Sequence, residues 1–217
     1  MNTKDKLKEI KQSFRIFMNG ATSSSMRKKG LNYKINWGVP LPILRQNAEK
    51  YGKDYELAIE LWKDDIRECK IMATYIMPAQ MMKREQVDKW METVRNQELA
   101  ELISFNLLKN LAFSQTLAFD YMSSKDNIYQ ICGYQLLASL FVDGHIPNDL
   151  LINKFLTLVQ GVLKEGELNV QHSAFNSINK FCDLGEKYRS LVVKALPEID
   201  FLGSVVKPSC IPLPSCT

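Results

Sequence analysis

Basic side chains are concentrated at the beginning of this chain, where they could neutralise the phosphates of a nucleic acid. Residues 1–53 carry 12 lysines and arginines against 3 acidic residues, a net charge of +9. Phosphate binding needs cationic side chains and little other chemistry. The alternative is a solvated helix face, a common place for lysines. The residues that we expect to touch phosphate are Arg27, Lys28, Lys29 and Arg45, with Lys70 and Lys109 as secondary members.

A single carboxylate, Glu101, lies in a mostly apolar stretch and is the candidate for catalysis. Its neighbours at 99, 100, 102 and 103 are Leu, Ala, Leu and Ile. Gln97 lies one helical turn earlier, on the same helix face. The alternative is an exposed helix glutamate that pairs with Arg95 or Lys109, or with nothing.

Cysteines and histidines give no sign of a metal centre. The five cysteines include no CxxC pair and are odd in number, which is typical of a reduced intracellular protein. His145 and His172, the two histidines, are far apart. We therefore expect no metal and no cofactor. The N-terminus lacks the apolar segment of a secretory signal, and no run is long and apolar enough for a membrane span, so we expect a cytoplasmic location.

Apolar residues at three- and four-residue spacing, separated by caps and breakers, predict an all-α protein. Residues 31–39 are a predicted loop, and a non-helical tail is predicted over 208–217, after a single domain of 1–207. The helices are predicted over 4–19 (ended by Asn19-Gly20), 22–30 (capped within Thr22–Ser25), 42–51, 54–62 (capped by Asp54), 64–77, 84–95, 97–110, 112–122, 125–143, 147–165, 168–183 and 185–196.

Four of these segments share a polar starter followed by a small residue among apolar ones. The starters are Asp65, Asn96, Asp126 and Asn169, which are 31, 30 and 43 residues apart. Such spacing is typical of degenerate paired-helix repeats of the HEAT or armadillo kind. It predicts an α-solenoid of HEAT-like repeats, with an irregular helix bundle as the alternative.

Three tryptophans could serve either the core or a nucleic acid. Trp62 and Trp90 lie among apolar helix residues, so we expect both in the core. Trp37 lies in the predicted loop beside basic residues. It could lie over a DNA backbone, but we expect it to pack under the first helices.

Five motifs in the first half of the chain are informative in combination: Gly38-Val-Pro-Leu-Pro-Ile-Leu-Arg45, Leu61-Trp62, Ile66-Arg-Glu-Cys-Lys-Ile-Met-Ala73, Trp90 and Asn96-Gln-Glu-Leu-Ala-Glu101. Taken together, they resemble the DNA alkylation repair family of AlkD-like, HEAT-repeat DNA glycosylases. The resemblance extends over about 26–110. It implies a right-handed solenoid whose positive concave face holds duplex DNA, and an enzyme that removes N3- or N7-alkylated purines.

The resemblance also assigns roles to the residues of the candidate site. Glu101 matches the family's catalytic aspartate, which stabilises an oxocarbenium-like sugar and positions water. Gln97 matches a catalytic tryptophan and offers no cation–π surface. The segment 127–134 lacks the family's arginine, and 178–185 keeps Lys180 but lacks the tryptophan. These departures predict a DNA-binding protein whose glycosylase activity is slow, altered or lost.

The charge of the remaining chain supports an interpretation from another class. Residues 54–217 carry 16 basic against 21 acidic residues, a net charge of −5. A groove that holds DNA should be basic. The alternative is therefore a non-enzymatic HEAT-repeat scaffold that binds a protein partner or a DNA structure.

Overall fold

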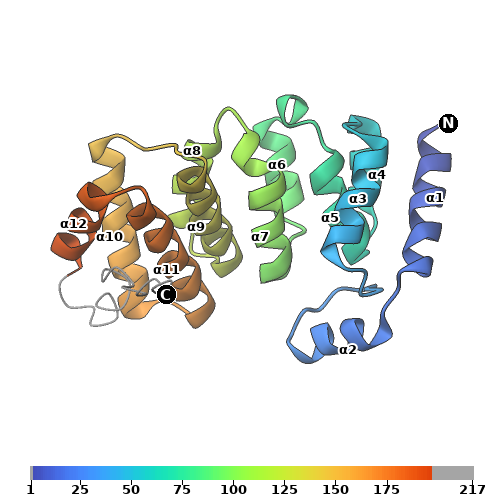
Figure 1. Cartoon of the computed structure of the whole chain (residues 1–217), viewed down its shortest axis with the longest axis horizontal. Coiled ribbons are helices and arrows are strands. Elements are labelled where there is room, and N and C mark those ends of the chain that lie inside the picture. Colours follow the sequence, from blue (N-terminus) through green and yellow to red (C-terminus); the bar gives the residue numbers. More distant parts are fainter. Residues whose placement is uncertain (1, 197–217) are drawn as a thin grey trace, which may run out of the picture.

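The computed structural model describes residues 2–196, which form two layers of helices standing side by side (Figure 1). One layer consists of α3 (Leu41–Tyr51), α5 (Arg67–Ile76), α7 (Gln97–Asn106), α9 (Asn127–Val142) and α11 (Leu168–Asp183). The other consists of α1 (Thr3–Ile16), α4 (Tyr55–Lys63), α6 (Arg84–Met91), α8 (Ser114–Met122) and α10 (Asp149–Glu165). Further elements are α2 (Gly20–Lys28), which lies crosswise beneath the layers, α12 (Glu186–Ala195) at the far end, and two short 3-10 turns, η1 (Ala79–Met81) and η2 (Leu108–Asn110).

Polar contacts join α5, α7, α9 and α11 along the first layer. Asn106 of α7 donates to the Thr74 hydroxyl of α5 at 2.9 Å. The Ser104 hydroxyl of α7 donates to the Cys132 carbonyl of α9 at 3.1 Å. Asn176 of α11 donates to the Gln135 side-chain oxygen of α9 at 2.9 Å. Each helix therefore contacts its sequential neighbours in the layer, which is the packing of a repeat array.

Ring and charge contacts join α4, α6, α8 and α10 along the second layer. The indoles of Trp62 (α4) and Trp90 (α6) stack with centroids 4.0 Å apart. Arg84 of α6 pairs with Asp120 of α8 at 2.8 Å. Lys154 of α10 lies 5.6 Å from the Phe119 ring of α8. The sequence left open a bundle or an array, and these contacts and Figure 1 show a HEAT-like array.

The repeated starters mark the layer that contains α5, α7, α9 and α11. Asn96 and Asp126 are the N-caps of α7 and α9, and their side chains accept N–H bonds from the first turns. Asp65 lies two residues before α5, and Asn169 lies in the first turn of α11. All four helices run in the same direction, so the starters lie at the lower edge of the view (Figure 1).

The first two helices differ from their predicted boundaries. α1 ends at Ile16, three residues before its predicted end. Asn19 does not end α1; it caps α2, accepting a bond from Thr22 N–H, so the expected caps within Thr22–Ser25 were wrong. The Asn19 N–H donates to the Trp37 carbonyl at 2.8 Å, which fixes the corner between the two helices. Gly30 ends the segment with φ +83°, as its place in the sequence predicts.

Several other boundaries follow the local signals, but α6 and α7 end earlier than predicted. Asp54 caps α4, and Pro40 precedes the first residue of α3. α10 continues through Gly161 without a break. α6 ends at Met91, four residues before its predicted end. The predicted tail over 208–217 lies outside the described residues, and the single domain over 1–207 stays a prediction.

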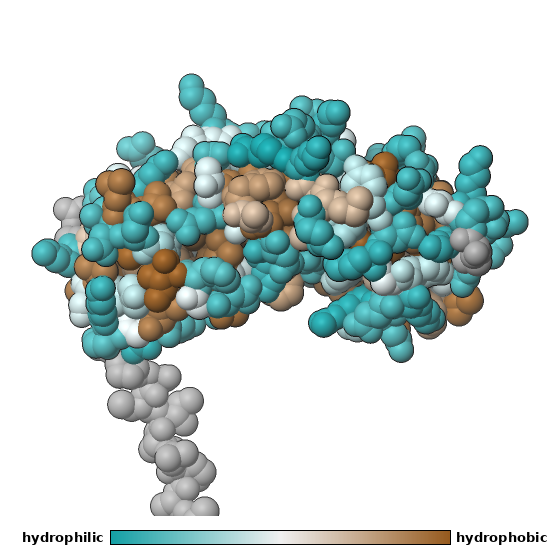
Figure 2. Space-filling view, turned by 90° about the horizontal axis from the view of Figure 1, so that it is seen from above, coloured by the Kyte–Doolittle hydropathy of each residue, from teal (hydrophilic) through white to brown (hydrophobic). Residues whose placement is uncertain are grey.

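The three tryptophans take the expected places. Trp62 and Trp90 are buried between α4 and α6. Trp37 is half-buried and packs on Phe14 of α1, with ring centroids 5.4 Å apart. Seen from above, the surface is mainly hydrophilic, with apolar residues gathered toward the left end and, in paler colour, near the middle (Figure 2). Within residues 2–196, no helix combines the length and apolar character needed to cross a bilayer.

Candidate nucleic-acid interface

A hollow of about 290 Å³ lies at the lower edge, where chain segments far apart in sequence converge. The loop after α2 contributes Lys29 and Gly30. The turn before α7 contributes Arg95 and Asn96, followed by Gln97. The starts of α9 and α11 complete the lining with Asn127, Ile128, Glu167 and Asn169. The hollow therefore combines two exposed cations with amide side chains and one carboxylate.

Three helices begin at this hollow. Because backbone N–H groups point out of a helix N-terminus, each carries about half a positive elementary charge there. α7, α9 and α11 all start at the lining residues. The positive ends of these helices add to the charges of Lys29 and Arg95, while the carboxylates of Glu167 and of Asp126, which caps α9, offset part of this positive charge. The two cations and the helix N-termini are the groups at the hollow that suit an anion such as a phosphate.

A buried ion cluster holds the loop and α7 in place beside the hollow. Arg67, which is 1% exposed, donates from Nε and Nη2 to both oxygens of Glu98 at 2.9 and 2.7 Å. Glu68 accepts the N–H groups of Trp37 and Val39, each at 3.2 Å. Tyr33 Oη lies 2.8 Å from Glu98 Oε2. Residues 33–39 are thereby joined to α5 and α7, so the end of α2 keeps a fixed position relative to Gln97.

The structure brings the two predicted catalytic positions together. The side-chain amide of Gln97 donates to Glu101 Oε1 at 2.7 Å, and both residues are half-buried. Gln97 lines the hollow, and Glu101 lies one turn further along α7. The carboxylate thus lies one helical turn beyond the lining of the hollow. It has an amide partner where the resemblance implies a tryptophan face.

Sequence reasoning missed Phe105, which lies further along α7, and Arg95, which lies at the hollow. Phe105, one turn after Glu101 on the same face, is 56% exposed and offers an aromatic surface. Its four-residue spacing from Glu101 is a signal that could have found it. Arg95 was considered only as a partner for Glu101, whereas it lines the hollow. No local signal shows that Arg95 lies near Lys29, because the two are 66 residues apart.

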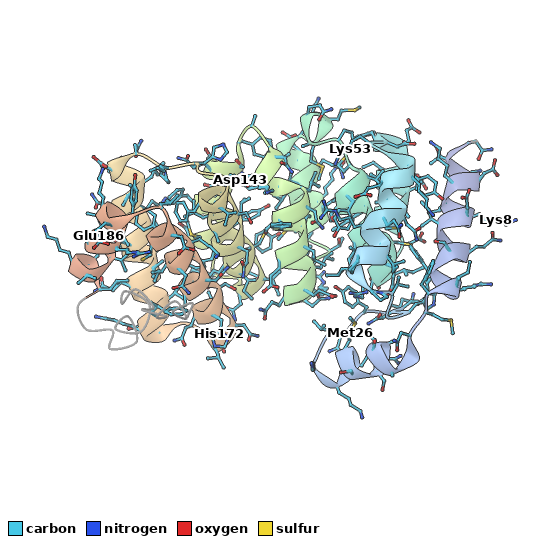
Figure 3. All side chains as sticks on the ribbon, viewed as in Figure 1. Lys8, Met26, Lys53, Asp143, His172 and Glu186 are labelled. Atoms are coloured by element: carbon cyan, nitrogen blue, oxygen red, sulfur yellow. The ribbon has the colours of Figure 1, made fainter. Side chains whose placement is uncertain are left out.

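The six predicted phosphate contacts do not form one group. Arg27, Lys28 and Lys29 are exposed at the end of α2, and Lys29 reaches the hollow. Arg45 is exposed on α3, where its Nε lies 3.4 Å from Glu49. Lys109 follows the other end of α7 and pairs with Asp143 at 3.0 Å, at the upper edge of Figure 3. Only the α2 group therefore lies near Gln97 and Glu101.

Lys70 points into the body of the protein. Its Nζ lies 4.6 Å from the Trp62 ring and 3.2 Å from the Thr93 hydroxyl, and the residue is 5% exposed. Burial lowers the pKa of this ammonium group below its ordinary value. A side chain in this position has little surface to offer a phosphate, so Lys70 is not part of the interface that we propose below.

The face formed by α7, α9 and α11 is not strongly basic. α7 carries Glu98 and Glu101, and α9 has no charged residue. On α11, Lys180 pairs with Asp183 at 3.4 Å. The positive face implied by the resemblance is therefore limited to the lower edge and the first helices, where the basic residues of the sequence lie. Among residues 2–196, no three His, Cys, Asp or Glu side chains form a group that could hold a metal.

Comparisons with known proteins agree with this architecture. The sequence model of a family described as "DNA alkylation repair enzyme" matches residues 10–132. A solved structure, described as a new family of proteins related to the HEAT-like repeat DNA glycosylases with affinity for branched DNA structures, aligns with a TM-score of 0.76. The alignment covers 87% of this chain and 82% of that one at 18% identity, and shows a shared fold. A search of curated proteins gives no significant match.

Proposed function

The chain belongs to the DNA alkylation repair enzyme family, and from this premise we propose that it binds DNA through the phosphate backbone at the lower-edge hollow. The observation that carries the proposal is the convergence of Lys29, Arg95 and three helix N-termini on one hollow beside Gln97. Such a site suits phosphates spaced along a strand. We place the protein in the cytoplasm as part of the same proposal. Duplex DNA is the simplest partner, and the solved relative's affinity for branched DNA supports this partner class.

We further propose that base release is slow or absent. Glu101 lies one turn after the lining residue Gln97 on α7, but the Gln97 amide occupies one of its oxygens. An amide gives none of the cation–π stabilisation that an indole gives to a cationic purine or sugar. Phe105 presents an aromatic face one turn further on, where Lys109 Nζ already lies 4.8 Å from the ring. This geometry supports backbone binding more strongly than bond cleavage.

Binding is tested with a labelled duplex and a salt titration. A Lys29→Gln/Arg95→Gln variant should reduce the slope of log affinity against log salt by about 2. The matched control is Lys83→Gln/Lys89→Gln, which removes two exposed cations from α6 and the residue before it. The control should bind like the wild type. An unchanged slope in the hollow variant, or equal losses in both variants, contradicts the proposed site.

Catalysis is tested by release of 7-methylguanine and 3-methyladenine from methylated DNA. We expect the wild type to release these bases no faster than Glu101→Gln. Fast release that disappears in Glu101→Gln overturns this part of the proposal and assigns the carboxylate to the reaction. The Gln97→Trp variant is a useful third sample, because it restores the aromatic face that the resemblance implies.

A further inference from the structure

The outer side of α1 is a basic stripe that the lower-edge hollow does not include. Lys4, Lys8, Lys11 and Arg15 line one shallow hollow along this helix. Lys8 points away from the body at the end of the molecule (Figure 3). Lys11 pairs with Asp64 at 2.7 Å, while the other three are exposed. The stripe extends over about 16 Å of helix axis, enough to follow several phosphates of one strand.

The stripe ends at an exposed apolar corner. Ile16 and Met18 are 78% and 61% exposed, and Phe17 between them is also exposed. The same helix buries Ile10 and Phe14 completely, so its packing against the body does not need the corner. Three consecutive exposed apolar residues between two basic segments are the kind of feature at which a binding surface is sought. Arg15 precedes the corner, and Arg27, Lys28 and Lys29 follow it at the end of α2.

We propose that α1 and the corner Ile16–Met18 form a second DNA surface, which takes another arm of a branched DNA. This inference rests on the proposed function, because the first arm lies at the lower-edge hollow. α2 separates the corner from Lys29 by about 13 Å of helix, so two arms can diverge from this point. At a branch point, a base pair exposes an apolar face flanked by phosphates. Ile16 and Met18 pack on that face, and the stripe neutralises the backbone of the departing arm.

The test compares a labelled four-way junction with a linear duplex whose length equals two of its arms. Lys4→Gln/Lys8→Gln/Arg15→Gln should lower junction affinity about tenfold and reduce its salt slope by about 2 to 3, with duplex affinity unchanged. Its control, Lys83→Gln/Lys89→Gln/Lys154→Gln, removes three exposed cations from the α6 and α10 region. Ile16→Ala/Met18→Ala should lower the preference for the junction about fivefold. Leu150→Ala, at 77% exposure on α10, is the control for that change.

Each outcome separates this inference from the proposed function. If the wild type binds neither DNA, both fail. If it binds the duplex but the α1 variant keeps its preference for the junction, only the second surface is wrong. If the α1 variant loses equal affinity for the duplex and the junction, the second surface is also wrong, because the stripe would then belong to the first surface. Co-sedimentation with phosphatidylserine–phosphatidylcholine vesicles that needs Lys4, Lys8 and Arg15, with unchanged junction binding, assigns the stripe to a membrane instead.

Discussion

Arg67 and Glu98 form a doubly hydrogen-bonded ion pair that joins α5 to α7, with the Arg67 side chain enclosed in the protein. Burial alone lowers the pKa of Arg67, but the hydrogen bond and charge of Glu98, together with the smaller effects of Glu68 and Tyr33, raise this pKa above its ordinary value. The guanidinium therefore stays charged. Because Glu98 is next to Gln97, the pair sets the position of the proposed interface as well as the packing of two repeats.

Removing the side chain of Glu98 should lower the free energy of unfolding more than removing the side chain of Glu101. Glu98→Ala leaves a buried guanidinium with Glu68 as its remaining ionic partner, so we expect the free energy of unfolding to fall by about 3 kcal/mol. Urea denaturation followed by circular dichroism measures this free energy of unfolding. Glu101→Ala is the control, with an expected loss of about 0.5 kcal/mol, because this half-buried side chain bonds only to Gln97 in the contacts described. Equal losses for the two variants contradict the structural role of the pair.

The attachment of α1 should depend on pH through Asp54. Its carboxylate accepts a bond from Lys6 Nζ at 2.7 Å and one from Leu57 N–H at 3.0 Å. The Lys6 bond, which outweighs the opposing effect of burial, holds the pKa of Asp54 below its ordinary 3.8. The stabilisation is therefore complete above pH 3.8 and is lost as the pH falls through the lowered pKa.

The measurement is thermal unfolding of wild type and Asp54→Asn at several pH values. We expect Asp54→Asn to be less stable by about 1 kcal/mol at pH 7, and the difference to disappear in strong acid. Asp65→Asn, which changes an exposed aspartate two residues before α5, is the control. A difference of constant size across the acid range is incompatible with this assignment.

Lys70 should contribute to packing and not to DNA affinity. Lys70→Met keeps the length of the side chain over Trp62 and removes the charge. Since the residue is 5% exposed, we expect duplex affinity and its salt slope to stay within twofold of wild type. Fluorescence anisotropy with the same duplex measures this beside Lys29→Gln. If Lys70→Met loses as much duplex affinity as Lys29→Gln, Lys70 belongs to the interface and this prediction is wrong.

Two glycines should respond to alanine in opposite directions. A Cβ at Gly133 meets Met122 N at 2.6 Å and the Ala118 carbonyl oxygen at 2.8 Å, because α8 and α9 approach closely there. Gly133→Ala should therefore lower the free energy of unfolding by about 1 to 3 kcal/mol. Gly161 lies inside α10 with nothing within 4 Å of an added Cβ. Gly161→Ala should raise it by about 1 kcal/mol. Urea denaturation of both variants decides whether the signs differ as expected.

The sequence by itself determined the helices and their repeated order. N-caps such as Asp54 and Asn96 act over three residues, and apolar spacing acts over one or two helical turns. Because both signals are local, they can be recognised without the tertiary structure. The recurrence of the starters at separations of 31, 30 and 43 residues already indicated an array. Gln97 and Glu101 were predictable as neighbours for the same reason, since they are one turn apart.

Only the tertiary structure decided which side chains meet. Asn19 ends no helix, because the distant Trp37 carbonyl takes its N–H and its side chain caps α2. Lys70 carries the positive charge that a phosphate contact needs, but the packing of α4 against α6 encloses its side chain beside Trp62. Lys29 and Arg95 share a hollow because the Arg67 cluster holds the loop against α7. Such contacts depend on packing between segments tens of residues apart, and helical periodicity contains no information about that separation.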